Sequence, residues 1–203
     1  MKNKTSQVIG LGDISFNFAV YIANQPAMAE YESLYQMVSL QNGDIADIGT
    51  VCGNGWRKVF NVYAKLLYAL NKEDFDFSLS ASTWQQYRDF YLLQEGSGTA
   101  LVFSAPLLRF RTTNTVLLID KDETRVEQSG PDNTVHIICG RTYAKSLIEK
   151  GVLNTELTWL DAEFAIDFRQ RVIVCPYFDY RQLSNNKIER LSVMLSNLVK
   201  GNI

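Results

Sequence analysis

The segment VHIICGRTYAKSLIEKG, residues 135–151, decides the fold class of this 203-residue chain. It opens with a near-continuous apolar run, Val135–Cys139, which is typical of a strand buried on both faces in a parallel sheet. Gly140 ends the run, and residues 141–150 then carry apolar side chains at helical spacing up to Gly151, a residue type that commonly ends helices. A buried strand that leads directly into an amphipathic helix is half of a βαβ unit, so the segment predicts an α/β fold.

The same alternation of apolar runs and helical patterns extends along the chain. Strands are predicted near residues 16–23, 100–104, 135–139 and 172–175. Helices are predicted at residues 56–70, 83–93 and 141–150 and from about residue 186 to the C-terminus. The first of these helices is the clearest, because its apolar stripe consists of Val59, Tyr63, Leu66, Leu67 and Leu70.

These elements predict a single α/β domain over residues 1–203, a three-layer sandwich with a mostly parallel central sheet and flanking helices. Residues 107–128 depart from the pattern, because short extended pieces are separated there by polar turns. A β-hairpin excursion is expected in this stretch instead of a crossover helix. Residues 41–55 contain four glycines and are expected to form an ordered loop.

The bulk composition argues against several classes of function. The net charge of −2 argues against a protein that coats nucleic acid through phosphate contacts alone, although a local basic patch is still allowed. The longest unbroken apolar run, Phe18–Ala23, is far shorter than the ~18 residues needed to cross a bilayer, so no membrane partner is expected. Residues 1–13 lack the apolar core of a secretory signal, so a cytoplasmic location is expected.

The cysteines and the histidine limit the available chemistry. Cys52, Cys139 and Cys175 form no CxxC pair and are expected to be reduced and mostly buried. His136, the single histidine, lies inside an apolar strand and is interpreted as a core residue, although a dyad with Cys175 stays open. With no acidic cluster at ligand spacing, neither a metal site nor a cofactor is expected.

A ligand site is predicted where the strands end, because open parallel sheets bind ligands outside the carboxyl ends of their strands. The segments there are rich in amides, aromatics and arginines, a mixture that suits a planar ligand with a nearby anion. Arg57, Arg141 and Arg181 are expected to make this crevice positive. The predicted ligand-binding residues are Asn24, Gln25, Ser104, Arg141, Cys175, Tyr177, Asp179 and Arg181.

The order of these segments resembles the uracil-DNA glycosylase superfamily. The resemblance rests on a first strand ending in residues 24–26, a Gly-rich loop before a helix, the run at 99–109, and a late strand ending at Cys175. It implies that Gln25 stands at the position of the catalytic aspartate and Cys175 at that of the histidine that stabilises the departing base. The base-reading asparagine would be Ser104. Both principal catalytic groups are therefore missing, and the fold would not carry the activity with it.

The sequence thus favours an α/β protein that binds a nucleobase, nucleotide or nucleic acid in a glycosylase-like crevice without efficient excision. Two alternatives stay open. One is a non-catalytic protein-interaction domain, and the other is an enzyme of unrelated chemistry that uses Cys175 or Asp179. Tyr177 and its aromatic neighbours could equally serve packing, and Arg141 could form an ordinary surface ion pair.

Overall fold

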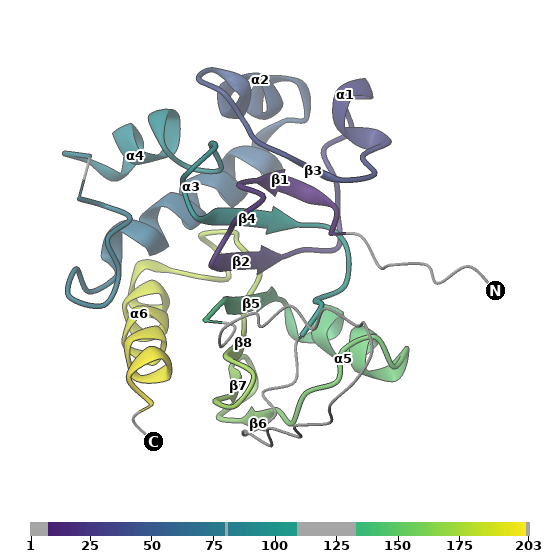
Figure 1. The fold of residues 1–203 in the computed structure, drawn as a ribbon, viewed down its shortest axis with the longest axis vertical. Coiled ribbons are helices and arrows are strands. Elements are labelled where there is room, and N and C mark those ends of the chain that lie inside the picture. Colours follow the sequence, from purple (N-terminus) through teal and green to yellow (C-terminus); the bar gives the residue numbers. More distant parts are fainter. Residues whose placement is uncertain (1–7, 80, 109–132, 202–203) are drawn as a thin grey trace, which may run out of the picture.

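A mixed sheet forms the centre of the computed structural model, which describes residues 8–79, 81–108 and 133–201 (Figure 1). Its strands lie in the order β3-β1-β4-β2-β5-β8-β7-β6. Their bounds are Gly10–Gly12 for β1, Phe18–Tyr21 for β2, Met37–Val38 for β3, Thr99–Val102 for β4, Val135–Cys139 for β5, Thr158–Trp159 for β6, Ala165–Asp167 for β7 and Val172–Cys175 for β8.

The four predicted strands are consecutive neighbours in the middle of this sheet. Strand β2 pairs in parallel with β4 on one side and with β5 on the other, and β5 pairs in parallel with β8. All four are buried along their whole length, as the apolar runs require. The predicted α/β class and parallel core are therefore confirmed.

The outer strands were not predicted, and they make the sheet mixed. Strand β1 runs antiparallel to β4 and parallel to β3, while β7 runs antiparallel to β8 and β6 antiparallel to β7. Parallel pairings still outnumber antiparallel ones by four to three. The expected hairpin excursion falls mainly on residues 109–128, which lie outside the described part of the chain; residues 107 and 108 have no regular structure.

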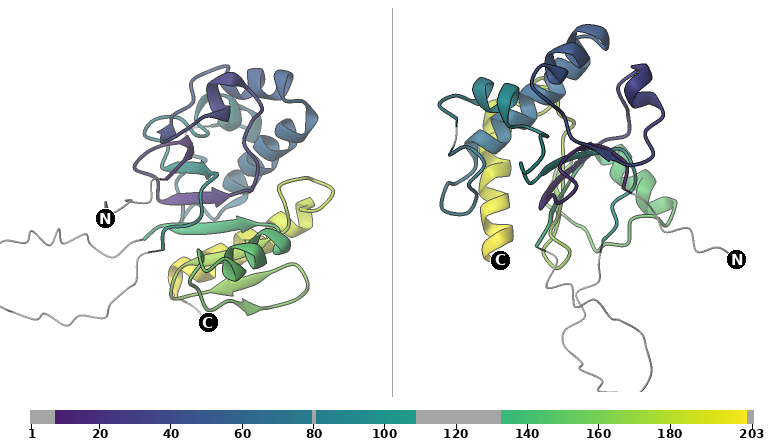
Figure 2. Two further views of the ribbon diagram at one scale, coloured as in Figure 1. Left: turned by 90° about the vertical axis from the view of Figure 1, so that its right-hand side faces the viewer. Right: turned by 45° about the horizontal axis from the view of Figure 1, so that its top comes forward.

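Helices cover both faces of the sheet, which gives the expected three layers. Helices α3, α4 and α6 lie on one face and α5 on the other (Figure 2, right). The helix bounds are Ala29–Glu32 for α1, Asp44–Val51 for α2, Asn54–Ala69 for α3, Trp84–Phe90 for α4, Arg141–Glu149 for α5 and Asn185–Lys200 for α6. The larger core cluster lies between the sheet and α2, α3, α4 and α6, and a smaller one lies under α5.

Helix α3 carries the predicted stripe into the larger core. Val59, Tyr63, Leu66 and Leu67 are almost completely inaccessible to solvent. Tyr63 also donates its hydroxyl to the carbonyl oxygen of Ala100 in β4, at 3.0 Å, and so ties the helix to the sheet. The prediction that this face packs into the core is confirmed.

Two helix predictions need correction. Residues 41–55 contain helix α2 and are not simply a loop, because Ile45 and Ile48 lie one turn apart and bury against α3 despite the surrounding glycines. Helix α4 ends at Phe90, three residues before the predicted end: Tyr91 leaves the helical backbone with φ of −134°, and Leu93 adopts a left-handed backbone with φ of 61°.

Within the described ranges, no helix combines the length and the apolar character needed to cross a bilayer.

Candidate functional site

The carboxyl ends of the four central strands meet at one edge of the sheet. We define this carboxyl edge as residues 22–26, 103–104, 139–143 and 175–182. In the left view of Figure 2, β2 and β5 point toward this edge, and the loop that precedes α6 lies there. Because these strands are parallel neighbours, segments far apart in the sequence are brought together.

Asn24 and Tyr177 meet across the end of β5. Their side chains lie close to each other, although one follows β2 and the other follows β8. Tyr177 is half-buried, and burial is the main reason that the pKa of its phenol is raised, with the nearby Cys139 and Asp179 adding to the effect. Asn24 acts in the opposite direction. Two predicted ligand residues are thus brought together at the carboxyl edge.

Asp179 joins the loop after β8 to helix α3. Its carboxylate lies 2.8 Å from the Nζ of Lys58 and accepts a backbone hydrogen bond from Arg181 at 3.0 Å. The Lys58 hydrogen bond and charge, with the Arg181 N–H, hold the pKa of Asp179 below its usual value. Asp179 is therefore a paired anion, and this setting does not suit a general base.

Tyr180 lies between two of these cations and is half-exposed. Its ring centroid is 5.1 Å from the Nζ of Lys58 and 6.0 Å from the guanidinium carbon of Arg181. The side chain is 53% exposed, so an aromatic surface flanked by positive charge faces solvent. Lys58 was not predicted as a site residue. The one sequence feature that could have indicated Lys58 is its position in the first turns of α3, a helix that begins beside the carboxyl edge.

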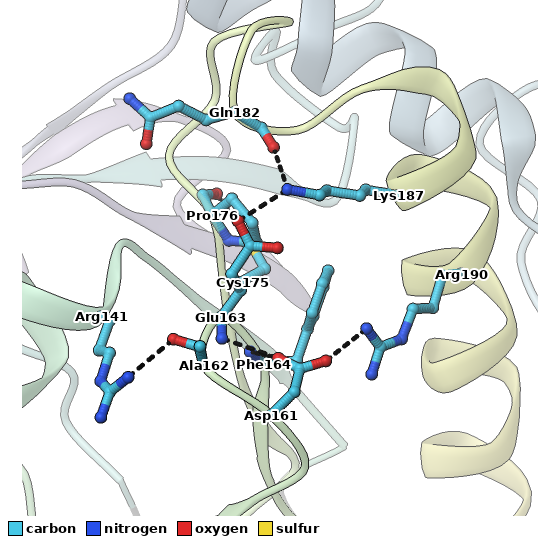
Figure 3. Close-up of polar contacts among 10 residues, drawn as sticks. All are labelled: Arg141, Asp161, Ala162, Glu163, Phe164, Cys175, Pro176, Gln182, Lys187 and Arg190. Carbon is cyan, nitrogen blue, oxygen red and sulfur yellow. Dashed lines mark hydrogen bonds and ion pairs between the residues drawn. The ribbon is translucent and has the colours of Figure 1, made fainter.

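Arg141 lies against the tip of the β6–β7 hairpin (Figure 3). Its Nη1 donates to the carbonyl oxygen of Ala162 at 3.0 Å, and its guanidinium lies 4.8 Å from the ring of Trp159. The side chain therefore stacks on an indole and bonds a carbonyl, a different arrangement from the surface ion pair that the sequence left open. These contacts fix the guanidinium next to the N-terminus of α5.

Helix α6 holds the other side of the same hairpin tip. The Nζ of Lys187 lies 2.7 Å from Glu163 and donates to the carbonyl oxygen of Gln182 at 3.0 Å, and Arg190 pairs with Asp161 (Figure 3). The Glu163 N–H is the main reason that the pKa of Asp161 falls to about 2, with the Phe164 N–H and Arg190 contributing. The tip is thus clamped between α5 and α6, and it forms one wall of the carboxyl edge.

Cys139 and Cys175 lie side by side in register at the ends of β5 and β8. Both are buried, and burial, together with the neighbouring Cys175 thiol, raises the pKa of Cys139 well above its usual value. Cys175 also donates to the carbonyl oxygen of Pro176 at 3.3 Å. The predicted burial of these two thiols is confirmed, and Cys175 is a packed residue and not an exposed ligand contact.

His136 is the core residue that the sequence indicated. It is buried, and its Nδ1 lies 2.8 Å from the hydroxyl of Tyr21. His136 is three residues from Cys139 in β5, an odd spacing that places the two side chains on opposite faces of the sheet. Because Cys175 shares a face with Cys139, the structure excludes a Cys175–His136 dyad.

Three other residues that the sequence placed at the ligand site, Ser104, Gln25 and Arg57, do not join the groups described above. Ser104 accepts a hydrogen bond from the backbone N–H of Ile9 at 3.2 Å, which anchors the entry to β1. Gln25 is exposed in the turn before α1. Arg57 does not join Arg141 and Arg181: its Nε donates to the carbonyl oxygen of Gly49 at 2.8 Å, and it lines a cavity of about 240 Å³ between α2, α3 and α4.

The arrangement can hold an anion or a polar planar ligand, but it offers no cluster for a metal ion. Among the side chains of residues 8–79, 81–108 and 133–201, no three of the histidine, cysteine, aspartate and glutamate groups gather closely enough to bind one.

The fold and this edge define a three-layer α/β protein with polar and aromatic side chains at the ends of its parallel strands. The chain belongs to a family of unknown function, DUF6942, whose model matches residues 9–196. Neither the curated proteins nor the solved structures include one that matches the chain significantly.

Proposed function

We propose that the carboxyl edge binds a nucleobase-containing ligand, either a nucleotide or a segment of nucleic acid, and does not excise the base efficiently. The observation that carries the proposal is that Asn24 and Tyr177 lie beside each other across the end of β5. An exposed amide next to a phenol presents both donors and acceptors, the groups that read the edge of a base.

Tyr180 supports the base-binding part of the proposal. An exposed aromatic ring next to a hydrogen-bonding amide is the combination with which proteins hold unstacked bases. Lys58 is paired with Asp179, so Arg181 is the cation beside the ring that is left to attract a phosphate joined to such a base.

The start of α5 supports the anion-binding part. The helix begins after Gly140, which caps it without a side-chain hydrogen bond, and the backbone N–H groups of its first turn favour a negative ligand. Arg141 is fixed beside this turn by Trp159 and Ala162. A phosphate at this point would therefore meet both a helix N-terminus and an oriented guanidinium.

The same residues argue against excision. Hydrolysis of a glycosidic bond in the manner of the glycosylases needs a positioned carboxylate for the water and a group that stabilises the departing base. The resemblance puts Gln25 and Cys175 at those positions; an amide cannot deprotonate water, and Cys175 is completely buried. Asp179, the carboxylate of the neighbouring loop, is neutralised by Lys58.

Binding is tested by fluorescence anisotropy with a labelled single-stranded oligonucleotide, using the full chain and matched arginine variants. Arg181→Ala should weaken binding by about fivefold at low salt, the loss expected for one phosphate contact. Arg169→Ala is the control, because Arg169 is also exposed but lies before β8, at the opposite end of that strand. Equal weakening by both variants would show that binding is non-specific and not located at the carboxyl edge.

Excision is tested separately with a uracil-containing oligonucleotide followed by cleavage at abasic sites. No product above background is expected. Multiple turnovers that disappear in Gln25→Ala would show that the chain catalyses the reaction by a route that needs no carboxylate at this position.

A further inference from the structure

A second cavity lies at the opposite end of the sheet from the carboxyl edge. It has a volume of about 230 Å³ and is lined by Asp76, Phe77, Tyr87, Phe90, Tyr91 and residues 94–97. Gly96 and Ser97 lie two to three residues before β4, so the cavity lies at the amino end of a strand whose carboxyl end leads into the candidate site. The two sites are therefore separate.

Four aromatic residues are among those that line the cavity. Tyr87, Phe90 and Tyr91 are spaced i, i+3 and i+4, so they lie on one side of α4 and its final turn. The rings of Tyr87 and Tyr91 are stacked at 6.1 Å with an interplanar angle of 20°. The Phe90 side chain also lines the cavity and is 51% exposed, which is unusual for a phenylalanine. Phe77 completes the set from the loop before α4.

The charged groups that line this cavity are all acidic. Asp76 and Glu95 contribute carboxylates, and no lysine, arginine or histidine is among the lining residues. Asp76 lies close enough to Tyr87 for its charge to add to burial in raising the pKa of that phenol. The neighbouring cation of α4, Arg88, contacts Asp89 and Asn61 and lines the separate cavity between α2, α3 and α4.

We propose that this cavity binds the alkylated ammonium head group of a small organic cation. Aromatic faces attract such a cation through their quadrupoles, and its alkyl groups replace water against the rings. The two carboxylates supply the opposite charge at the rim, where an anion would be repelled. The small volume suits a compact head group, such as a trimethylammonium.

The proposal is tested by NMR titration of the ¹⁵N-labelled full chain with choline and with 3,3-dimethylbutan-1-ol, its neutral isostere. Choline should shift the amide signals of residues 87–97, and the isostere should bind at least about tenfold more weakly. A short peptide containing trimethyllysine is the third probe. Tighter binding of the peptide than of choline assigns the head group to a protein side chain, and the reverse order assigns it to a free metabolite.

Matched variants separate the cavity from the rest of the surface. Phe90→Ala should weaken choline binding by about fivefold, and the double change Asp76→Asn with Glu95→Gln by about tenfold. Tyr35→Ala and Glu73→Gln are the controls, because both residues are exposed and neither lines the cavity. Equal affinity for choline and its isostere, no binding of either cation, or shifts confined to the carboxyl edge would overturn the proposal.

Discussion

The ion pair between Lys58 and Asp179 should couple helix α3 to the loop that carries Tyr180. The Nζ and Oδ2 atoms are 2.8 Å apart, and the side chains are only 15% and 21% exposed. At this distance the attraction is about 1.5 kcal/mol even at the dielectric constant of water, and partial burial strengthens it while adding a desolvation cost. We expect a coupling free energy of about 1 to 1.5 kcal/mol, above the range of fully exposed pairs.

A double-mutant cycle measures this coupling. Lys58→Met and Asp179→Asn preserve the side-chain shapes, and urea unfolding of the four proteins at pH 7 gives the interaction free energy. The control is the cycle for Lys187 and Glu163, which are 2.7 Å apart but 33% and 44% exposed, and which should give less than about 0.5 kcal/mol. Equal coupling in the two cycles would refute the reasoning from burial.

The Lys58–Asp179 cycle should also depend on pH. The pKa of Asp179 is lowered in the folded state, so its contribution to stability is fully present above the ordinary value of 3.8 and is lost as the pH falls through the lower, folded pKa. The coupling should therefore shrink in acid. A coupling that stays constant down to pH 2 would show that the carboxylate charge is not its source.

Three further changes test the fold. Leu66→Ala should lower the free energy of unfolding by about 2 to 5 kcal/mol, because Leu66 is completely buried; a loss below about 1 kcal/mol in urea unfolding would contradict its core position. Gly12→Ala should lower the free energy of unfolding by about 3 kcal/mol, because φ is 124° and a Cβ would lie 2.3 Å from the carbonyl oxygen of Thr99. The control is Gly55→Ala, which should be neutral or slightly stabilising because a Cβ at Gly55 would meet open space. Asp161→Asn should reduce the loss of thermal stability between pH 3.8 and about 2, the range in which the unfolded carboxyl binds a proton and the folded one is still largely ionised; an unchanged loss of stability in acid would contradict this assignment.

The sequence predicted the centre of the sheet and missed its outer strands for one physical reason. Strands buried on both faces need long apolar runs, and β5 and β8 carry them. Strand β1 contains one leucine between two glycines, and β3 and β6 have two residues each. Pairing with neighbours, and not local preference, makes these short segments extended.

The carboxyl edge was predictable because strand topology alone brings its segments together. Asn24 and Tyr177 follow from that rule. The partner of Asp179 does not, since Lys58 is 121 residues away and no local pattern links them. The sequence could not show that the Arg57 side chain lies against Gly49 and away from the carboxyl edge. A Cβ at position 49 would lie 2.7 Å from the Arg57 side chain, so the arginine fits there because residue 49 is a glycine.

The central claim is that the carboxyl edge binds a nucleobase together with a phosphate. It is tested most directly by titrating the ¹⁵N-labelled chain with uridine monophosphate, uridine and inorganic phosphate and following the amide signals. The account predicts that the nucleotide shifts signals at residues 23–25, 140–143 and 177–182 together, and that it binds more tightly than uridine or phosphate alone. Loss of these shifts in the double variant Asn24→Ala with Tyr180→Ala would support the same location. Shifts that phosphate alone reproduces in full, or that fall outside these segments, would contradict the claim.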